Sequence, residues 1–233
     1  MAVILNIETS TSVCSVALSK DGTVVFNRHN YDGQSHATHL GVFVQEAIEY
    51  TKVNDLTLEA VAISCGPGSY TGLRIGVSTA KGLCYAKDIP LIAINTLEVL
   101  ACELLFDFKI DEKALLCPMI DARRMEVYAA IYDRALNALK PISADIIDES
   151  SYRELLDNNK IIFFGNGAEK CKASLSHPNA TFVEDKHPLA DYMIALAEKA
   201  FNAEQFVDVA YFEPFYLKEF VATTPKDKVL KTF

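Results

Sequence analysis

Apolar and polar positions alternate with two different periods in the first half of the chain. Short apolar, β-branched runs bounded by turn residues predict strands at residues 3–7, 13–18, 23–27, 60–64 and 91–94. Apolar residues at helical spacing predict helices at residues 35–50, 71–85 and 97–105. The expected order is therefore β-β-β-α-β-α-β-α.

The same order then begins again. We expect strands at residues 115–120, 127–132, 142–147, 160–164 and 181–184, and helices at 151–157, directly after the glycine pair at 165 and 167, and at 189–201. The repetition predicts an α/β fold of two duplicated halves, residues 1–106 and 107–233, each with a mixed sheet. Ligands in such folds bind outside the strand ends or between the halves.

Composition changes this picture mainly through charge. The 233 residues are half hydrophobic, which suits a protein with a real core, but the net charge is −9. The densest basic cluster is in the C-terminal tail, and Arg123-Arg124 is the only adjacent arginine pair; the cluster comprises Lys218, Lys226, Lys228 and Lys231. Nucleic-acid binders usually carry a basic patch, so a partner is expected to supply most of the positive surface for any nucleic-acid contact.

Targeting signals and cysteine spacing point to the cytoplasm. No apolar run reaches the roughly 18 residues that span a bilayer, and the N-terminus resembles a first strand more than a signal peptide, so no membrane partner is expected. The six cysteines include no C-x-x-C pair. Free thiols in a reducing compartment are favoured over disulfides or a zinc site.

Residues 64–76 form a glycine-rich turn between a predicted strand and a predicted helix. Such a turn offers free backbone N–H groups and a positive helix end to a phosphate, with Gly66 and Gly68 as candidates. The same glycines also allow close packing. Because Gly72 and Gly76 continue along the helix, we favour a helix–helix interface between residues 35–50 and 71–85, with Arg74 at the interface or bracing the turn. Glutamate at Leu73 or Gly76 is then expected to abolish pairing and leave the fold intact.

One carboxylate ends the first strand of each half. Glu8, followed by Thr9 and Ser10, either contacts a metal or water or accepts hydrogen bonds from its own turn, and the residues leave both readings open. Asp121 is its equivalent in the second half, and in an active member of such a fold the two carboxylates would face each other across the cleft. Arg123 and Arg124 are expected to pair with Asp121 or Glu126.

Two further groups remain as candidates. Gly165 and Gly167 form a weaker phosphate-loop candidate in the second half. His36 and His39 share a helix face, but two histidines without a third ligand favour a solvated or interface role over a metal site.

Four stretches resemble known motifs. Residues 4–10 with 13–18 look like the first phosphate hairpin of the actin/hexokinase/Hsp70-like ATPase superfamily. Residues 66–76 resemble the GPGSFTGLRIG signature of the TsaB (YeaZ) family, and residues 121–128 resemble its D-A-R-x-x-E-V-Y turn. Tyr216-Leu217-Lys218 resembles the closing Y-L-R of that family, with lysine in place of arginine.

The resemblance implies actin-like (ribonuclease H-like) halves and a role in making threonylcarbamoyladenosine beside the tRNA anticodon. Members of this family are taken to be non-catalytic dimerisation partners of the catalytic paralogue TsaD, and the ATPase TsaE docks on the pair. It further implies a homodimer when the chain is alone and tRNA contact only through the complex. No cofactor is expected to bind tightly, and ATP or ADP with Mg stays open at the level of the complex.

In the catalytic paralogue a His-x-x-x-His metal pair occupies the positions where this chain has Thr96 and Leu100. Neither side chain replaces an imidazole ligand, which argues against a metallopeptidase and an autonomous transferase, so no catalytic and no metal-binding residue is expected. The alternatives are an ATP-dependent small-molecule kinase or transferase and, third, a glycoprotease-type peptidase. The expected partner interface comprises His36, His39, Leu40, Phe43, Ala47, Thr71, Leu73, Arg74, Gly76, Val77 and Ala80. The expected vestigial nucleotide site comprises Glu8, Thr9, Ser10, Gly66, Gly68, Asp121, Gly165 and Gly167.

Overall fold

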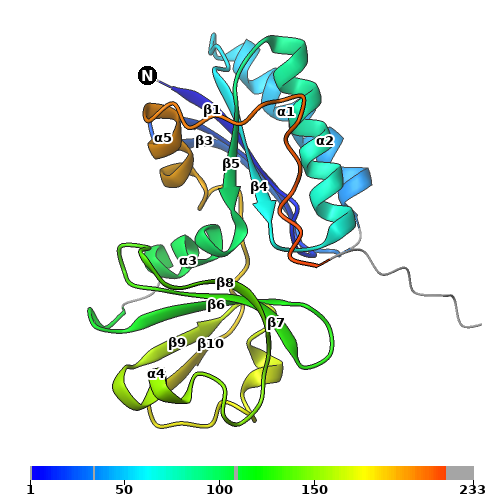
Figure 1. Ribbon diagram of the computed structural model, residues 1–233. Coiled ribbons are helices and arrows are strands. Elements are labelled where there is room, and N and C mark those ends of the chain that lie inside the picture. The colour runs from blue at the N-terminus through cyan, green and yellow to red at the C-terminus, as the bar shows by residue number, and fades with distance from the viewer. Residues whose placement is uncertain (1, 34, 108–109, 219–233) are drawn as a thin grey trace, which may run out of the picture.

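Two five-stranded sheets, one above the other, make the frame of the molecule in the computed structural model, which describes residues 2–33, 35–107 and 110–218 (Figure 1). The first lobe contains β1 (Val3–Glu8), β2 (Cys14–Lys20), β3 (Thr23–Asn30), α1 (His36–Val53), β4 (Ala60–Gly66), α2 (Tyr70–Lys87) and β5 (Leu91–Asn95), followed by α3 (Thr96–Asp107). The second contains β6 (Leu115–Asp121), β7 (Glu126–Tyr132), β8 (Ala138–Ile146), α4 (Arg153–Asn158), β9 (Ile161–Phe164), a 3₁₀ turn (Glu169–Cys171) and β10 (Ala180–Val183), followed by α5 (Ile194–Asn202).

The two sheets have the same topology. The first runs in the order β3-β2-β1-β4-β5, with β1–β2 and β2–β3 antiparallel and β1–β4 and β4–β5 parallel. The second runs β8-β7-β6-β9-β10 with the same directions. Every residue of the central strand β1 is buried, as expected for a strand covered on both faces. The predicted duplication of mixed α/β halves is confirmed.

One predicted element is wrong. The helix expected after Gly167 is only a 3₁₀ turn, Glu169–Cys171. Its hydrogen bonds join residues three apart, as from the Cys171 N–H to the Ala168 carbonyl at 2.9 Å. The segment is confined between the Gly167 turn and Pro178, and such short turns still bury Cys171 and Leu175 in the core.

The two lobes exchange helices. In the first lobe α1 and α2 cover one face of the sheet, whereas α5 packs against β1 and β5 on the other face. In the second lobe α4 covers the outer face, and α3 lies between the two sheets on β6 (Figure 1). The expected division at residues 106 and 107 therefore falls between the strands of the two sheets, and α3 and α5 each pack beyond it.

A C-terminal strap, residues 203–218, returns over the first lobe. The Val207 N–H donates to the Leu91 carbonyl of β5 at 2.9 Å. The strap then follows α2 down toward the second lobe (Figure 1), and the Lys81 Nζ donates to the carbonyls of Ala210 at 3.1 Å and Phe212 at 3.0 Å. The last described residues of the chain thus contact both β5 and α2 of the first lobe.

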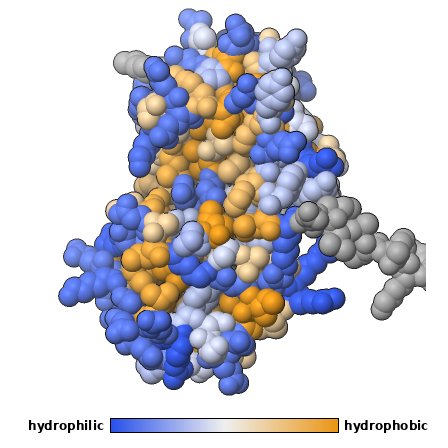
Figure 2. Space-filling model, in the orientation of Figure 1, coloured by the Kyte–Doolittle hydropathy of each residue, from blue (hydrophilic) through white to orange (hydrophobic). Residues whose placement is uncertain are grey.

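The surface of this face is mixed. Figure 2 shows apolar side chains reaching the surface over the first lobe between α5 and α2, with hydrophilic side chains around them. Within the described residues, no helix is both long and apolar enough to cross a membrane. All six cysteines are free thiols, as predicted.

Candidate functional site: the strand ends and glycine turns

The turn after β1 is buried inside the first lobe. Glu8, Thr9 and Ser10 have no exposed surface. The Ser10 N–H donates to Glu8 Oε1 at 2.5 Å, so the carboxylate accepts a hydrogen bond from its own turn. Burial raises the pKa of Glu8 to about 7, against which the hydrogen bonds from Ser10 act. Of the two readings of Glu8, the contact with its own turn is the one that the geometry displays.

Three glycines leave the space into which this turn packs. A Cβ on Gly68 would lie 2.3 Å from the Ser10 carbonyl oxygen, and one on Gly72 would lie 2.1 Å from the Thr9 carbonyl oxygen. A Cβ on Gly76 would lie 2.2 Å from the Thr9 hydroxyl. The expectation that these glycines serve close packing is met, but the group they admit is the turn after β1 and not another helix.

The fourth glycine of the motif leaves space for the C-terminal strap to pack against it. Gly66 has a φ of +112°, which disfavours any other residue, and a Cβ there would lie 2.7 Å from the Phe215 carbonyl oxygen. The Phe215 N–H donates to the Cys65 carbonyl at 2.7 Å. The closing motif at residues 216–218 therefore begins, in space, directly beside the start of the glycine motif.

The N-terminus of α2 is capped by the chain itself. The Ser69 hydroxyl accepts from the Gly72 N–H at 3.2 Å, and the Ser69 N–H donates to the Ser10 carbonyl at 2.6 Å. In phosphate-binding turns such N–H groups point at the anion. Here the Gly72 and Ser69 N–H groups bind serine oxygens, and the turn after β1 packs directly on the glycines.

The predicted interface residues divide into two groups. His39 and Phe43 are half-buried and Thr71 and Arg74 are exposed, so these four reach the surface of α1 and α2. The other seven are buried in the chain's own core: His36, Leu40, Ala47, Leu73, Gly76, Val77 and Ala80. Glutamate at Leu73 or Gly76 would therefore disrupt the first lobe, and the expectation that it leaves the fold intact is wrong.

Neither histidine position is arranged as a metal site. Burial lowers the pKa of His36, and the His39 Nδ1 lies 3.2 Å from the Ser35 carbonyl oxygen. Ser35 does not cap α1 with its side chain, because its hydroxyl donates to Asn30 Oδ1 at 2.7 Å. Thr96 and Leu100, at the positions expected for the paralogue's histidines, are fully buried. Among the described residues, no group of three or more histidine, cysteine or acidic side chains is placed to hold a metal ion.

The strand end of the second lobe repeats the arrangement of the first. A Cβ on Gly165 would lie 2.5 Å from the Met119 carbonyl oxygen, and one on Gly167 would lie 3.0 Å from the Asp121 N. Asn166 Oδ1 accepts from the Asp121 N–H at 2.9 Å. The glycine turn after β9 thus packs on the end of β6, as the turn after β4 packs on the end of β1.

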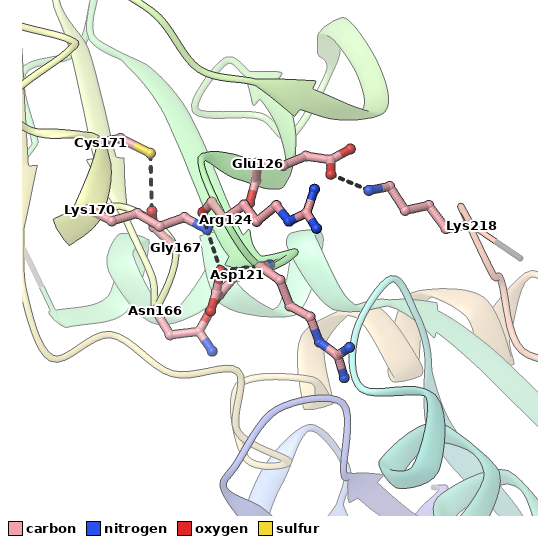
Figure 3. Close-up of polar contacts among 9 residues, drawn as sticks. Asp121, Arg124, Glu126, Asn166, Gly167, Lys170, Cys171 and Lys218 are labelled. Atoms are coloured by element: carbon pink, nitrogen blue, oxygen red, sulfur yellow. Dashed lines mark hydrogen bonds and ion pairs between the residues drawn. The ribbon is translucent and has the colours of Figure 1, made fainter. Parts of the chain in front are cut away.

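Lysines, not arginines, pair with the carboxylates here (Figure 3). Lys170 forms an ion pair with Asp121, and Lys218 forms one with Glu126. The expected pairing of Arg123 or Arg124 with these carboxylates is therefore wrong. Asp121 is exposed whereas Glu8 is enclosed, so the two carboxylates do not form a matched pair facing a shared solvent cleft.

Sequence reasoning missed Lys170 and Asn166. Lys170 lies 49 residues from Asp121, and no local pattern marks such a contact. Lys218 could be singled out from the sequence, because it belongs to the closing motif 216–218. The motif alone does not reveal Glu126 as its partner. The described part of the tail cluster is Lys218 alone; Lys226, Lys228 and Lys231 lie outside the described residues.

Comparison with known proteins places this geometry in a family. The family model described as "TsaD: tRNA N6-adenosine threonylcarbamoyltransferase" matches residues 30–226. The chain is 30% identical to the tRNA threonylcarbamoyladenosine biosynthesis protein TsaB of Escherichia coli over 227 residues, 94% of this chain and 96% of that protein. It is 34% identical to the TsaB of Bacillus subtilis over 143 residues, 61% of this chain and 60% of that protein.

Solved structures agree on the fold. YeaZ from Pseudomonas aeruginosa superposes with a TM-score of 0.76 at 24% identity, covering 93% of this chain and all of that one. A second crystal structure, of a protein with similarity to peptidase YEAZ from Pseudomonas aeruginosa, has a TM-score of 0.80 at 24% identity and covers 94% of this chain. The chain has the specific glycine motif and the duplicated topology, and it matches the Escherichia coli relative along nearly its whole length. It belongs to the TsaB (YeaZ) family.

Proposed function

We propose that this chain is a non-catalytic adaptor subunit in the synthesis of threonylcarbamoyladenosine on tRNA, working in the cytoplasm beside a TsaD-like paralogue. The observation that carries the proposal is the match to TsaB proteins over the full fold, which includes the glycine motif. In the adaptor role that motif is structural, because its glycines seat the chain's own turn and strap.

The closed strand end supports an adaptor over an independent ATP-dependent enzyme. A kinase would need the carboxylate after β1 and the glycine turn to face a nucleotide. Glu8, Thr9 and Ser10 are buried, and Ser10 and Ser69 use the backbone groups of the turn. Thr96 and Leu100 likewise supply no ligand for a catalytic metal.

The outer faces of α1 and α2 are the proposed contact with the paralogue, and with a second copy of the chain when it is alone. His39 and the 50% exposed Val42 are three residues apart on α1, and Arg74 is exposed on α2. A TsaE-like ATPase is proposed to dock on the assembled pair.

The test is reconstitution. The chain and the TsaD-like paralogue of its own organism are mixed, the mass is followed by light scattering, and threonylcarbamoylation of unmodified tRNA is assayed with each protein alone and with both. A stoichiometric complex that is active only with both proteins supports the adaptor. A chain that ignores the paralogue but binds Mg-ATP in calorimetry would refute it.

Two matched variants locate the contact. Val42→Glu puts a charge on the exposed face of α1 and is expected to weaken the complex at least tenfold. Val24→Glu makes the same change at a 42% exposed position on β3 and should leave the affinity unchanged. Equal affinities for the two variants would exclude the α1 face.

A further inference from the structure

The turn between β6 and β7 holds two consecutive arginines in a costly backbone conformation. Arg123 has a φ of +70° and Arg124 a φ of +50°, in the left-handed region that non-glycine residues rarely adopt. Such a residue is strained and persists only where its surroundings impose the conformation. Here the Arg123 N–H donates to Asp121 Oδ1 at 3.0 Å and the Glu126 N–H donates to the Arg123 carbonyl at 3.2 Å.

Lysine side chains fix the turn from both sides (Figure 3). Lys170 pairs with Asp121 and also donates to the carbonyls of Arg124 at 2.6 Å and Glu126 at 2.7 Å. Lys218 pairs with Glu126. Asp121 and Glu126, the carboxylates that were expected to pair with the arginines, are therefore each paired with a lysine.

Both arginine side chains are exposed, and among the described residues neither guanidinium takes part in an ion pair. The turn and its two lysines carry four cations and two carboxylates, and Asp148 and Glu149 line the same surface hollow as Met125 of the turn. The two guanidinium groups are therefore exposed cations at a fixed place on the surface of a chain whose net charge is −9. Guanidinium groups bind phosphate oxygens through two parallel hydrogen bonds and stay charged at all physiological pH values.

We propose that Arg123 and Arg124 bind the phosphate backbone of the tRNA. The inference rests on the proposed function, which supplies the RNA. We favour RNA phosphate over a carboxylate of a protein partner because protein interfaces need a buried apolar centre, whereas backbone phosphates need only exposed cations held in place. The turn offers two such cations and the exposed Met125 as its one large apolar residue.

The test uses the double variant Arg123→Ala with Arg124→Ala. Its control is Arg134→Ala with Arg153→Ala, which removes the same charge at the other end of β7 and on α4. Affinity for unmodified tRNA is measured against salt concentration, both for the full chain alone and for its complex with the paralogue. The logarithm of the affinity should fall with the logarithm of the salt concentration about 2 units less steeply in the double variant than in the wild type and the control. The loss should be equal for tRNAs of different sequence, because phosphates carry no sequence information.

Two results would overturn the proposal: identical salt slopes for the double variant and the control in the complex, or a double variant that no longer forms the complex with the paralogue. The second result would assign the arginines to a protein contact. Because the readout is RNA binding, it is independent of the transferase assay. A wild-type complex that binds tRNA but leaves it unmodified counts against the proposed function and not against the arginine contact.

Discussion

Substituting alanine for glycine at two places on α2 should change stability in opposite directions. Gly72 and Gly82 both lie within the helix, where alanine is normally favoured by about 1 kcal/mol. A Cβ at Gly82 would meet no atom within 4 Å. A Cβ at Gly72 would lie 2.1 Å from the Thr9 carbonyl oxygen, so helix and turn must move apart by more than about 1 Å to reach ordinary contact.

The size of the effect follows from these contacts. Overpacking against backbone costs about 1–3 kcal/mol. The displacement also breaks the hydrogen bond that the Thr9 hydroxyl donates to the Gly72 carbonyl at 2.9 Å, at about 1 kcal/mol. After the gain in helix propensity, Gly72→Ala should lower the free energy of unfolding by about 2 kcal/mol, whereas Gly82→Ala should raise it by about 1 kcal/mol.

Urea and thermal unfolding followed by circular dichroism measure both variants beside the wild type. A gap of about 3 kcal/mol corresponds to midpoints roughly 6–12 °C apart for a chain of this size. If Gly72→Ala is as stable as Gly82→Ala, the turn after β1 does not impose the glycine, and our structural explanation of the motif fails.

Three further outcomes follow. Glu8→Gln removes a titrating carboxyl. Because burial raises the pKa of Glu8 from 4.5 to about 7, the free energy of unfolding of the wild type should fall by roughly 3 kcal/mol relative to that of the variant as pH rises through this window. A difference in urea unfolding that stays constant between pH 5 and pH 8 would contradict this. Lys81→Ala removes the two hydrogen bonds to the strap, so amide exchange in residues 208–216 should accelerate about tenfold, while Lys87→Ala, at the exposed end of α2, should leave it unchanged. Burial raises the pKa of the Cys65 thiol to about 12, so at pH 8 it should react with a disulfide reagent about 10³-fold more slowly than a free cysteine; rapid reaction of one thiol in the native protein would argue against the buried environment.

The strands were predictable because each combines apolar or β-branched residues with a nearby turn signal. β1 and β6 are central strands, and the apolar runs with which they begin are what burial on both faces requires. The helix expected after Gly167 was not formed, because spacing alone does not distinguish α-helix from a 3₁₀ turn over so few residues.

The candidate site was predictable only in part. The glycine motif predicted that another segment approaches it closely, and in the structure the turn after β1 does so at Gly68, Gly72 and Gly76. Its partner, Thr9, is 63 residues away from Gly72, and a single sequence holds no record of that contact. For the same reason the interface prediction mixed exposed residues such as Arg74 with core residues such as Leu73.

The exchange of helices between the lobes sets the order in which a nascent chain is completed. The β1 and β4 face bearing Ile4 and Ala62 is covered by α5, which is translated after every strand of both sheets. By contrast, α3, which covers β6, has already emerged when the second sheet is made. Domains usually complete in N-to-C order during synthesis. The element order therefore predicts that the second lobe is covered first, and that the part of the first lobe under α5 stays uncovered until about residue 202 has left the ribosome.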